Sequence, residues 1–305
     1  MSDSQLWPAL PLKEWSDTCV TLHMWTQVVG KVRLAMSPKL NHWWEVPLYV
    51  SARGLTTSPV PHAAGIFEIE FDLIDHELLI ETSSGDVKSL RLAPRSVADF
   101  YGSLMETLRS IGIHPRLWTM PCEVPNPIRF EQDNVHASYD PDYANRFFRV
   151  LVSADTALKE FRAGFLGKAS PVHFFWGSFD LAATRFSGRR APERQSADPI
   201  TREAYSHEVI SAGFWPGGGA IADAAFYAYA APEPPGFSKA AVRPQAASYS
   251  PQLSEFILMY DDVRKAASPH SALLDFFQST YEAGATLGNW DRQALEKASC
   301  VAARA

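Results

Sequence analysis

Seven apolar residues near the middle of the chain follow one another at alternating steps of three and four positions: Ala144, Phe147, Leu151, Ala154, Leu158, Phe161 and Phe165. Residues at this spacing share one face of an α-helix, and Asp140-Pro141 is a typical helix start. The pattern predicts a long helix over 140–165. Such a helix must bury its apolar face against another element, so the chain needs a layered fold with a core.

β-Structure is predicted on both sides of this helix. The segment 67–73 alternates apolar and acidic residues, which is typical of a strand with one buried face. Turn sequences at 75–76 and 83–86 separate it from the next two apolar segments, so we expect an antiparallel meander. The other expected elements are helices at 16–36, 96–111 and from 268 onward, and strands at 48–56, 77–82, 87–92, 172–186, 226–229 and 255–260.

The order of a long helix, strands and a second helix occurs twice. We therefore predict an α+β fold of two related halves, each an antiparallel sheet covered by helices. The expected parts are a first half at 1–120, a proline-rich connector at 121–139, a second half at 140–295 and a tail at 296–305. The second half is longer than the first because of an irregular stretch at 187–222, which we interpret as an insertion.

Short motifs also correspond between the two halves. Ser37-Pro38 and the later His42-Trp43-Trp44 match Ser170-Pro171 and the later His173-Phe174-Phe175-Trp176. Two explanations stay open. The chain contains an internal duplication, or both motifs reflect chemistry that is common where helices end.

Composition argues against several classes of partner. The chain has 305 residues and a formal net charge of -6 at pH 7, without the basic excess typical of nucleic-acid binding. We expect no membrane span and no secretory signal at the start. Cys19, Cys122 and Cys300 are too few and too widely spaced for a disulfide framework or a zinc site. We therefore expect reduced thiols and a soluble, cytoplasmic protein. The sequence identifies no cofactor, metal or oligomeric state.

Several longer motifs extend from the start of the chain to about Trp290. They are W-P-x-L-P from Trp7, N-H-W-W from Asn41, S-P-V-H-F-F-W-G-S-F-D-L from Ser170 and G-F-W-P-G-G-G from Gly213. With these motifs the chain resembles an uncharacterised bacterial family, a domain of unknown function, over nearly its whole length. The resemblance implies a bacterial cytosolic protein. It implies no activity and no catalytic residues.

An arginine- and glycine-rich segment contains the first set of candidate site residues. Arginines bind carboxylate or phosphate groups bidentately, and consecutive glycines let backbone N–H groups approach an anion. A histidine beside a glutamate offers proton transfer near neutral pH. The alternative is a solvated, flexible loop whose arginines pair with Glu193, Asp198 and Glu203. The candidates are Arg185, Arg189, Arg190, His207, Glu208, Gly217 and Gly218.

Two histidines that precede aromatic residues form the second set. His42 and His173 are expected to face one cleft between the halves, with Trp44 and Trp176 as its walls. The alternative is that both histidines only hydrogen-bond the backbone at strand entries. Arg53 and Asp180 lie in strand patterns and either face water or line the same pocket. We expect 187–219 to fold over the cleft as a lid, with Trp215 packed down and His207 beside His173.

The leading hypothesis is an enzyme that acts on a small polar, anionic molecule in this cleft. In it the arginines hold the anion, His207 with Glu208 moves protons, and His173 lies opposite. The alternative hypothesis is a non-catalytic protein that binds a small ligand or a partner through the same residues. The sequence does not decide between these classes and does not name the substrate.

Overall fold

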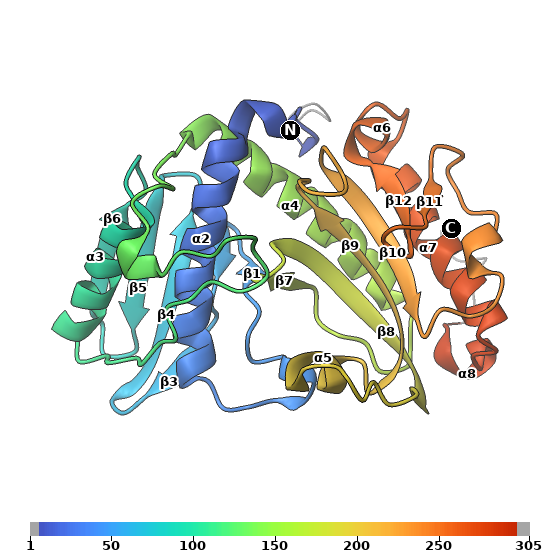
Figure 1. Ribbon diagram of the computed structural model, residues 1–305, viewed down its shortest axis with the longest axis horizontal. Helices are drawn as coiled ribbons and strands as arrows, with labels where there is room; N and C mark the ends of the chain where they lie inside the picture. Colours follow the sequence, from blue (N-terminus) through green and yellow to red (C-terminus); the bar gives the residue numbers. More distant parts are fainter. Residues whose placement is uncertain (1–5, 298–305) are drawn as a thin grey trace, which may run out of the picture. The chain divides into compact units, whose positions relative to one another are not determined.

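The computed structural model describes residues 6–297, which form two β-sheets and the helices that pack on them (Figure 1). Cys300 and most of the predicted tail lie outside the described residues. The helices are α2 (Leu12–Met36), α3 (Val97–Ser110), α4 (Pro141–Ala163), α5 (Pro199–Ala204), α6 (Tyr260–Arg264), α7 (Pro269–Leu287) and α8 (Arg292–Leu295), with short 3-10 helices η1 (Asn41–Trp43), η2 (Phe130–Gln132) and η3 (Phe237–Lys239). The strands are β1 (Tyr49–Val50), β2 (Gly54–Thr56), β3 (Val60–His62), β4 (Gly65–Asp72), β5 (Glu77–Thr82), β6 (Val87–Arg91), β7 (His173–Phe175), β8 (Asp180–Arg190), β9 (His207–Trp215), β10 (Ala225–Ala231), β11 (Ser248–Ser250) and β12 (Glu255–Met259).

Two antiparallel sheets confirm the predicted α+β class. The first sheet has the order β1-β2-β4-β5-β6, with β3 paired to β4, and the second has the order β11-β12-β10-β9-β8-β7. Neighbouring strands such as β4 and β5, or β9 and β10, run antiparallel. Short turns suffice to connect such neighbours, which is why turn sequences predicted the meander.

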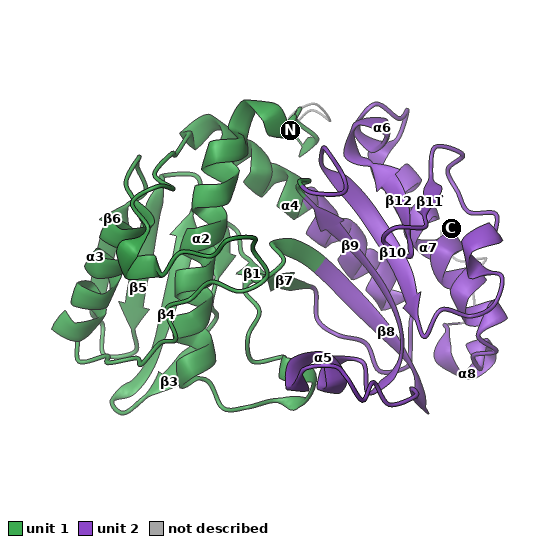
Figure 2. Cartoon of the chain, viewed as in Figure 1, with its two compact units in different colours: residues 1–152, 173–181, 216–218 green, residues 153–172, 182–215, 219–305 purple. Residues whose placement is uncertain are grey.

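The chain divides into two compact units (Figure 2). Unit 1 contains residues 1–152, 173–181 and 216–218, and unit 2 contains 153–172, 182–215 and 219–305. The division at a proline-rich connector and the internal duplication both stay predictions.

Unit 1 is built around α2, which lies across one face of the first sheet (Figure 1). Trp25 of α2 stacks on Phe100 of α3 at 4.8 Å between ring centroids, and Phe100 stacks on Phe71 of β4 at 6.3 Å. From Thr21 to Arg33 every residue of α2 except His23 is buried. A helix buried on all sides must satisfy its polar side chains inside the protein, so these side chains are where a site is sought.

Unit 2 is built around α7, which packs on β9 and β10. Phe277 of α7 meets Phe226 of β10 edge to face at 6.0 Å. Gly284 lies so close to β9 that a Cβ there would come within 2.9 Å of the Ile210 side chain. The absence of a side chain at Gly284 thus lets the helix approach the sheet.

Three expected boundaries are wrong. The first helix begins at Leu12, directly after Pro11, rather than at position 16. The segment 48–56 is two short strands joined by a turn, and 172–186 is the hairpin of β7 and β8. Phe179 has a left-handed φ of 62° in that hairpin turn, a conformation that apolar patterning does not reveal.

The prediction that 187–222 is irregular is also wrong. β8 continues to Arg190, α5 follows, and β9 lies between β8 and β10 inside the second sheet. A strand in the middle of a sheet is not a lid. β9 escaped detection because Val209–Phe214 is buried on both faces, so its residues do not alternate between apolar and polar.

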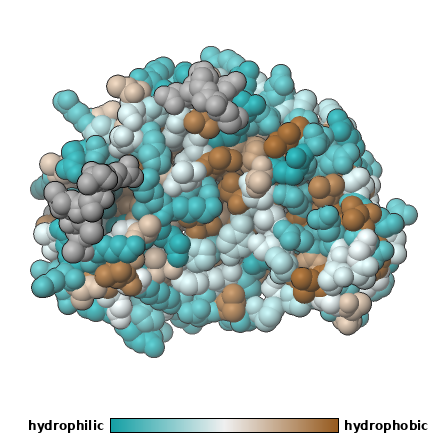
Figure 3. All heavy atoms as spheres, turned by 180° about the vertical axis from the view of Figure 1, so that it is seen from behind, coloured by the Kyte–Doolittle hydropathy of each residue, from teal (hydrophilic) through white to brown (hydrophobic). Residues whose placement is uncertain are grey.

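The surface of the described residues mixes hydrophilic and hydrophobic side chains. On the face that Figure 3 shows, hydrophobic residues form small separate groups among hydrophilic ones. Within 6–297 no helix combines the length and the apolar character that crossing a bilayer requires.

Candidate functional site

The N-H-W-W motif forms a strained turn between α2 and β1. His42 and Trp43 both have left-handed backbone conformations, with φ of 60° and 59°. Such a conformation is uncommon for residues other than glycine and costs on the order of 1–3 kcal/mol for each residue. The carboxylate of the buried Glu45 accepts a hydrogen bond of 3.0 Å from the backbone N–H of Leu40 and so closes the turn. Strain of this kind concentrates at functional sites, which makes the turn a candidate.

The turn brings the two predicted histidines to the same tryptophan. The Trp44 ring lies 5.4 Å from the His42 ring and 5.6 Å from the His173 ring. His173 is 1% exposed, and its ring also meets those of Tyr49 and Phe175 edge to face at 5.7 and 5.4 Å. Two backbone hydrogen bonds of 2.9 Å between position 48 and β7 hold these residues in register.

Arg33, near the end of α2, points its guanidinium toward the same aromatic group. Its central carbon lies 5.4 Å from the Tyr49 ring centroid, and one terminal nitrogen donates to the carbonyl of Thr57. Arg33 is only 8% exposed, and burial lowers its pKa, while Tyr49, Glu45 and Glu68 favour the charged form. Within 6–297 no carboxylate forms an ion pair with Arg33, and its Nε–H has no hydrogen-bond partner. The guanidinium is therefore a buried cation whose charge is only partly compensated.

A different face of α2 carries His23, Gln27 and Lys31 at steps of four residues. The Gln27 side-chain amide donates to the Cys122 carbonyl at 2.8 Å and accepts from the Cys122 N–H at 2.9 Å, which ties the proline-rich segment to the helix. The buried Lys31 ammonium donates to a backbone carbonyl at 2.8 Å and lies 5.9 and 6.0 Å from two aromatic rings. Burial lowers the pKa of Lys31.

His23 makes the stability of unit 1 depend on pH. Burial lowers its pKa from 6.5 to about 4, although the carbonyls of Trp176 and Gly177 favour the charged form. Between these two pH values the unfolded chain binds a proton that the folded chain does not. With respect to His23, the free energy of unfolding is therefore at its full value above pH 6.5. It falls on acidification toward pH 4, by up to about 1.4 kcal/mol per pH unit.

We expect the variant His23→Gln to show a flatter dependence of unfolding free energy on pH. Urea unfolding at several pH values between 4 and 7 measures the slope for both proteins. His114→Gln, at an exposed position, controls for the loss of one imidazole. Equal slopes for His23→Gln and the natural chain would refute the assignment of this proton to His23.

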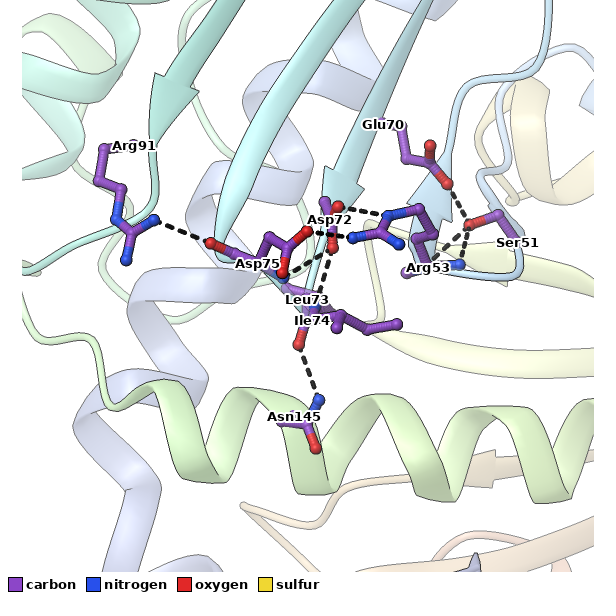
Figure 4. Close-up of polar contacts among 10 residues, drawn as sticks. Ser51, Arg53, Glu70, Asp72, Leu73, Ile74, Asp75, Arg91 and Asn145 are labelled. Carbon is purple, nitrogen blue, oxygen red and sulfur yellow. Dashed lines mark hydrogen bonds and ion pairs between the residues drawn. The ribbon is translucent and has the colours of Figure 1, made fainter.

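Arg53 lies in a network of ion pairs at the turn between β4 and β5 (Figure 4). Its guanidinium pairs with Asp72 and Asp75, and Asp72 also accepts backbone N–H bonds of 2.9 Å from positions 74 and 75. Asn145 of α4 donates to the carbonyl of Leu73 in the same turn. Because two carboxylates already neutralise Arg53, nothing here supports its predicted role in holding an anion.

The other predicted residues of unit 1 have structural contacts. The buried Trp176 donates its indole N–H to the Val46 carbonyl at 2.7 Å. Asp180, also buried, accepts a hydrogen bond from Ser178. Gly217 and Gly218 have φ of 99° and 116°, which residues with side chains rarely adopt. Ligand binding by these four residues stays a prediction.

In unit 2 the predicted arginine and glutamate neutralise each other. Arg189 donates to the Glu208 carboxylate at 2.9 and 2.7 Å. It also donates to the carbonyls of Gly288 and Asn289, the two residues that follow α7. Arg189 therefore pairs with a carboxylate, but with Glu208 rather than with Glu193, Asp198 or Glu203, and it lies in β8 rather than in a loop. The guanidinium acts here as a cation at the carbonyl end of a helix.

Arg185 is enclosed by aromatic rings. Its guanidinium carbon lies 3.5 Å from the ring centroid of Phe161, 4.2 Å from that of Tyr281 and 5.1 Å from that of Phe165. It is 2% exposed, and burial lowers its pKa to about 10, although Tyr281 and nearby glutamates favour the charged form. This environment indicates a structural cation rather than one that faces a ligand.

The remaining predicted residues of unit 2 lie near the ends of β8 and β9. Arg190 is exposed, while His207 and Trp215 are half-buried. Partial burial lowers the pKa of His207, and the positive charges of Arg190 and Lys168 lower it further. His207 belongs to unit 2 and His173 to unit 1, and their pairing stays a prediction.

Sequence reasoning missed Arg33 and Tyr49. Arg33 lies in the last turn of a helix, where a cation is common because it complements the helix dipole, so its type and position gave no signal. Tyr49 lies in a short strand and resembles any other core aromatic. Within 6–297 no three His, Cys, Asp or Glu side chains gather as a metal site.

A family of unknown function, DUF5996, matches residues 7–297, and the chain therefore belongs to that family. No curated protein and no solved structure matches the chain.

Proposed function

We propose that the chain is an enzyme that acts on a small anionic molecule at the turn site, defined as Arg33, His42, Trp44, Tyr49 and His173. The observation that carries this proposal is the buried guanidinium of Arg33, which lacks an ion pair among the described residues. Burying a charge without a counter-charge is costly, and a bound anion supplies the missing charge.

The neighbours of Arg33 have the chemistry that such a site needs. Trp44 and Tyr49 are half-buried and offer aromatic walls to a ligand, while the two histidines lie behind them. An imidazole beside a bound anion can move a proton to or from it. The roles first predicted for His207 and Glu208 have less support, because the carboxylate of Glu208 is held by Arg189.

A non-catalytic binder is the second candidate, and the depth of His173 favours it. A side chain that is 1% exposed reaches a substrate only if the aromatic walls move. In a binder the same residues hold the anion and no bond is broken.

The variant Arg33→Met tests whether the turn site binds an anion. We expect its free energy of unfolding to lie within about 1 kcal/mol of that of the natural chain. The gain from no longer burying a charge offsets the loss of the hydrogen bond that the guanidinium donates. A thermal-shift panel of inorganic phosphate, phosphate esters and small carboxylates measures binding. An anion present at about 100 times its Kd stabilises the natural chain by about 2.7 kcal/mol and leaves Arg33→Met unchanged.

Arg116→Met is the matched control, because Arg116 is exposed in the same unit. It removes the same charge and should keep the full thermal shift. If no anion stabilises the natural chain more than Arg33→Met, the proposed site is wrong. The variant His173→Gln then separates an enzyme from a binder, with NMR used to follow chemical conversion of the anion. In an enzyme this variant stops the conversion, while the Kd for the anion stays within a few-fold of that of the natural chain.

A further inference from the structure

Unit 2 contains a cavity of about 150 Å³ between the ends of β9 and β10 and the end of α7. Its apolar wall includes Val209, Ile210, Ala230 and three prolines, and the buried Trp290 closes one side. The cavity is partly open to solvent, because Pro232 and Glu233 of its lining are exposed, and its volume suits a molecule about the size of benzene. It belongs to a different unit from the turn site.

The charged lining of this cavity is entirely acidic. Among the described residues, Glu208 and Glu233 are the only carboxylates that line it, and no lysine or arginine does. Arg189 pairs with Glu208 from outside the lining, so Glu233 leaves the wall with a net negative charge. The carbonyl end of α7 lies at Gly288, which also lines the cavity, but the carbonyls of Gly288 and Asn289 already accept hydrogen bonds from Arg189.

Each carboxylate keeps one oxygen for a ligand. All hydrogen bonds that Glu208 accepts, from Ser187 and from Arg189, end on Oε2. The hydroxyl of Tyr249 likewise donates to Oε2 of Glu233. Within the described part of the chain, Oε1 of both residues accepts no hydrogen bond.

From this combination we propose that the cavity binds a small organic ammonium ion. The Glu233 carboxylate attracts its charge, the Trp290 ring that lines the cavity offers a cation–π contact, and the apolar wall accommodates its alkyl groups. An anion would meet repulsion from Glu233, which lines the cavity. The proposal therefore differs from the turn site in location and in the charge of the ligand, and neither depends on the other.

Tetramethylammonium is a suitable probe because its size matches the cavity, and tert-butanol is an uncharged molecule of similar shape. In the ¹⁵N-labelled full chain, the indole N–H signal of Trp290 is assigned by its absence from the variant Trp290→Phe. We expect tetramethylammonium to shift this signal with saturation at one site, and tert-butanol to shift it at least ten times more weakly.

Two variants locate the binding. Glu233→Gln keeps the contact with Tyr249 but removes the charge, and it should weaken binding at least tenfold. Ala230→Leu should fill the cavity and abolish the shift. Glu193→Gln is the matched control, because Glu193 is exposed elsewhere in unit 2, and it should bind as the natural chain does. Equal binding by Glu233→Gln and the natural chain, equal binding of tert-butanol, or no shift of the Trp290 signal at about 50 mM tetramethylammonium, a concentration that detects a site with a millimolar Kd, would each overturn the proposal.

Discussion

Replacing Gly30 by alanine is expected to destabilise the chain by about 3 kcal/mol, although alanine is the better helix former. In an isolated helix this change would stabilise by about 1 kcal/mol. Here a Cβ at position 30 would lie 2.3 Å from Cδ1 and Nε1 of Trp176, so the indole must move. Its displacement breaks the hydrogen bond to Val46 and disturbs the packing over Lys31.

Gly102 in α3 provides the matched control. It is exposed, and no heavy atom lies within 4 Å of the position that its Cβ would occupy. Gly102→Ala should therefore stabilise the chain by about 0.5–1 kcal/mol. Chemical unfolding of both variants measures the difference. If Gly30→Ala also stabilises the chain, Trp176 does not pack against α2 as described.

Truncating Arg185 to alanine is expected to cost about 3–5 kcal/mol. The change empties a cage formed by Phe161, Phe165 and Tyr281 and removes the cation that these rings surround. It also leaves the Phe161 carbonyl without the guanidinium donor. For a unit of this size the melting temperature should fall by roughly 6–20 °C.

Arg185→Met separates packing from charge. Methionine fills part of the cage without burying a charge, so this variant should recover at least half of the stability that Arg185→Ala loses. Arg190→Ala, at an exposed position on the same strand, is the control and should change the melting temperature by less than 2 °C, about the effect of 0.5 kcal/mol. A melting temperature of Arg185→Ala close to that of Arg190→Ala would mean that the cage does not stabilise unit 2.

The candidate site shows why residue type alone located only part of it. His42 and His173 stood out because each precedes aromatic residues after a helix, and the structure brings both rings to Trp44. Arg33 could not stand out, because its burial depends on β-strands that are distant in sequence. Arg53, Arg185 and Arg189 were predicted from their charge, but their partners come from other elements and leave them paired or enclosed.

The sequence by itself determined the class of fold and most helices. Helical periodicity and the acidic–apolar alternation of 67–73 are local signals, and the structure confirms the elements that they predict. Only the tertiary structure decided that β9 is a central strand and that α2 is buried on all sides with its cations inside. The physical reason is that periodicity reports one buried face, whereas an element buried on both faces has no polar face to reveal it.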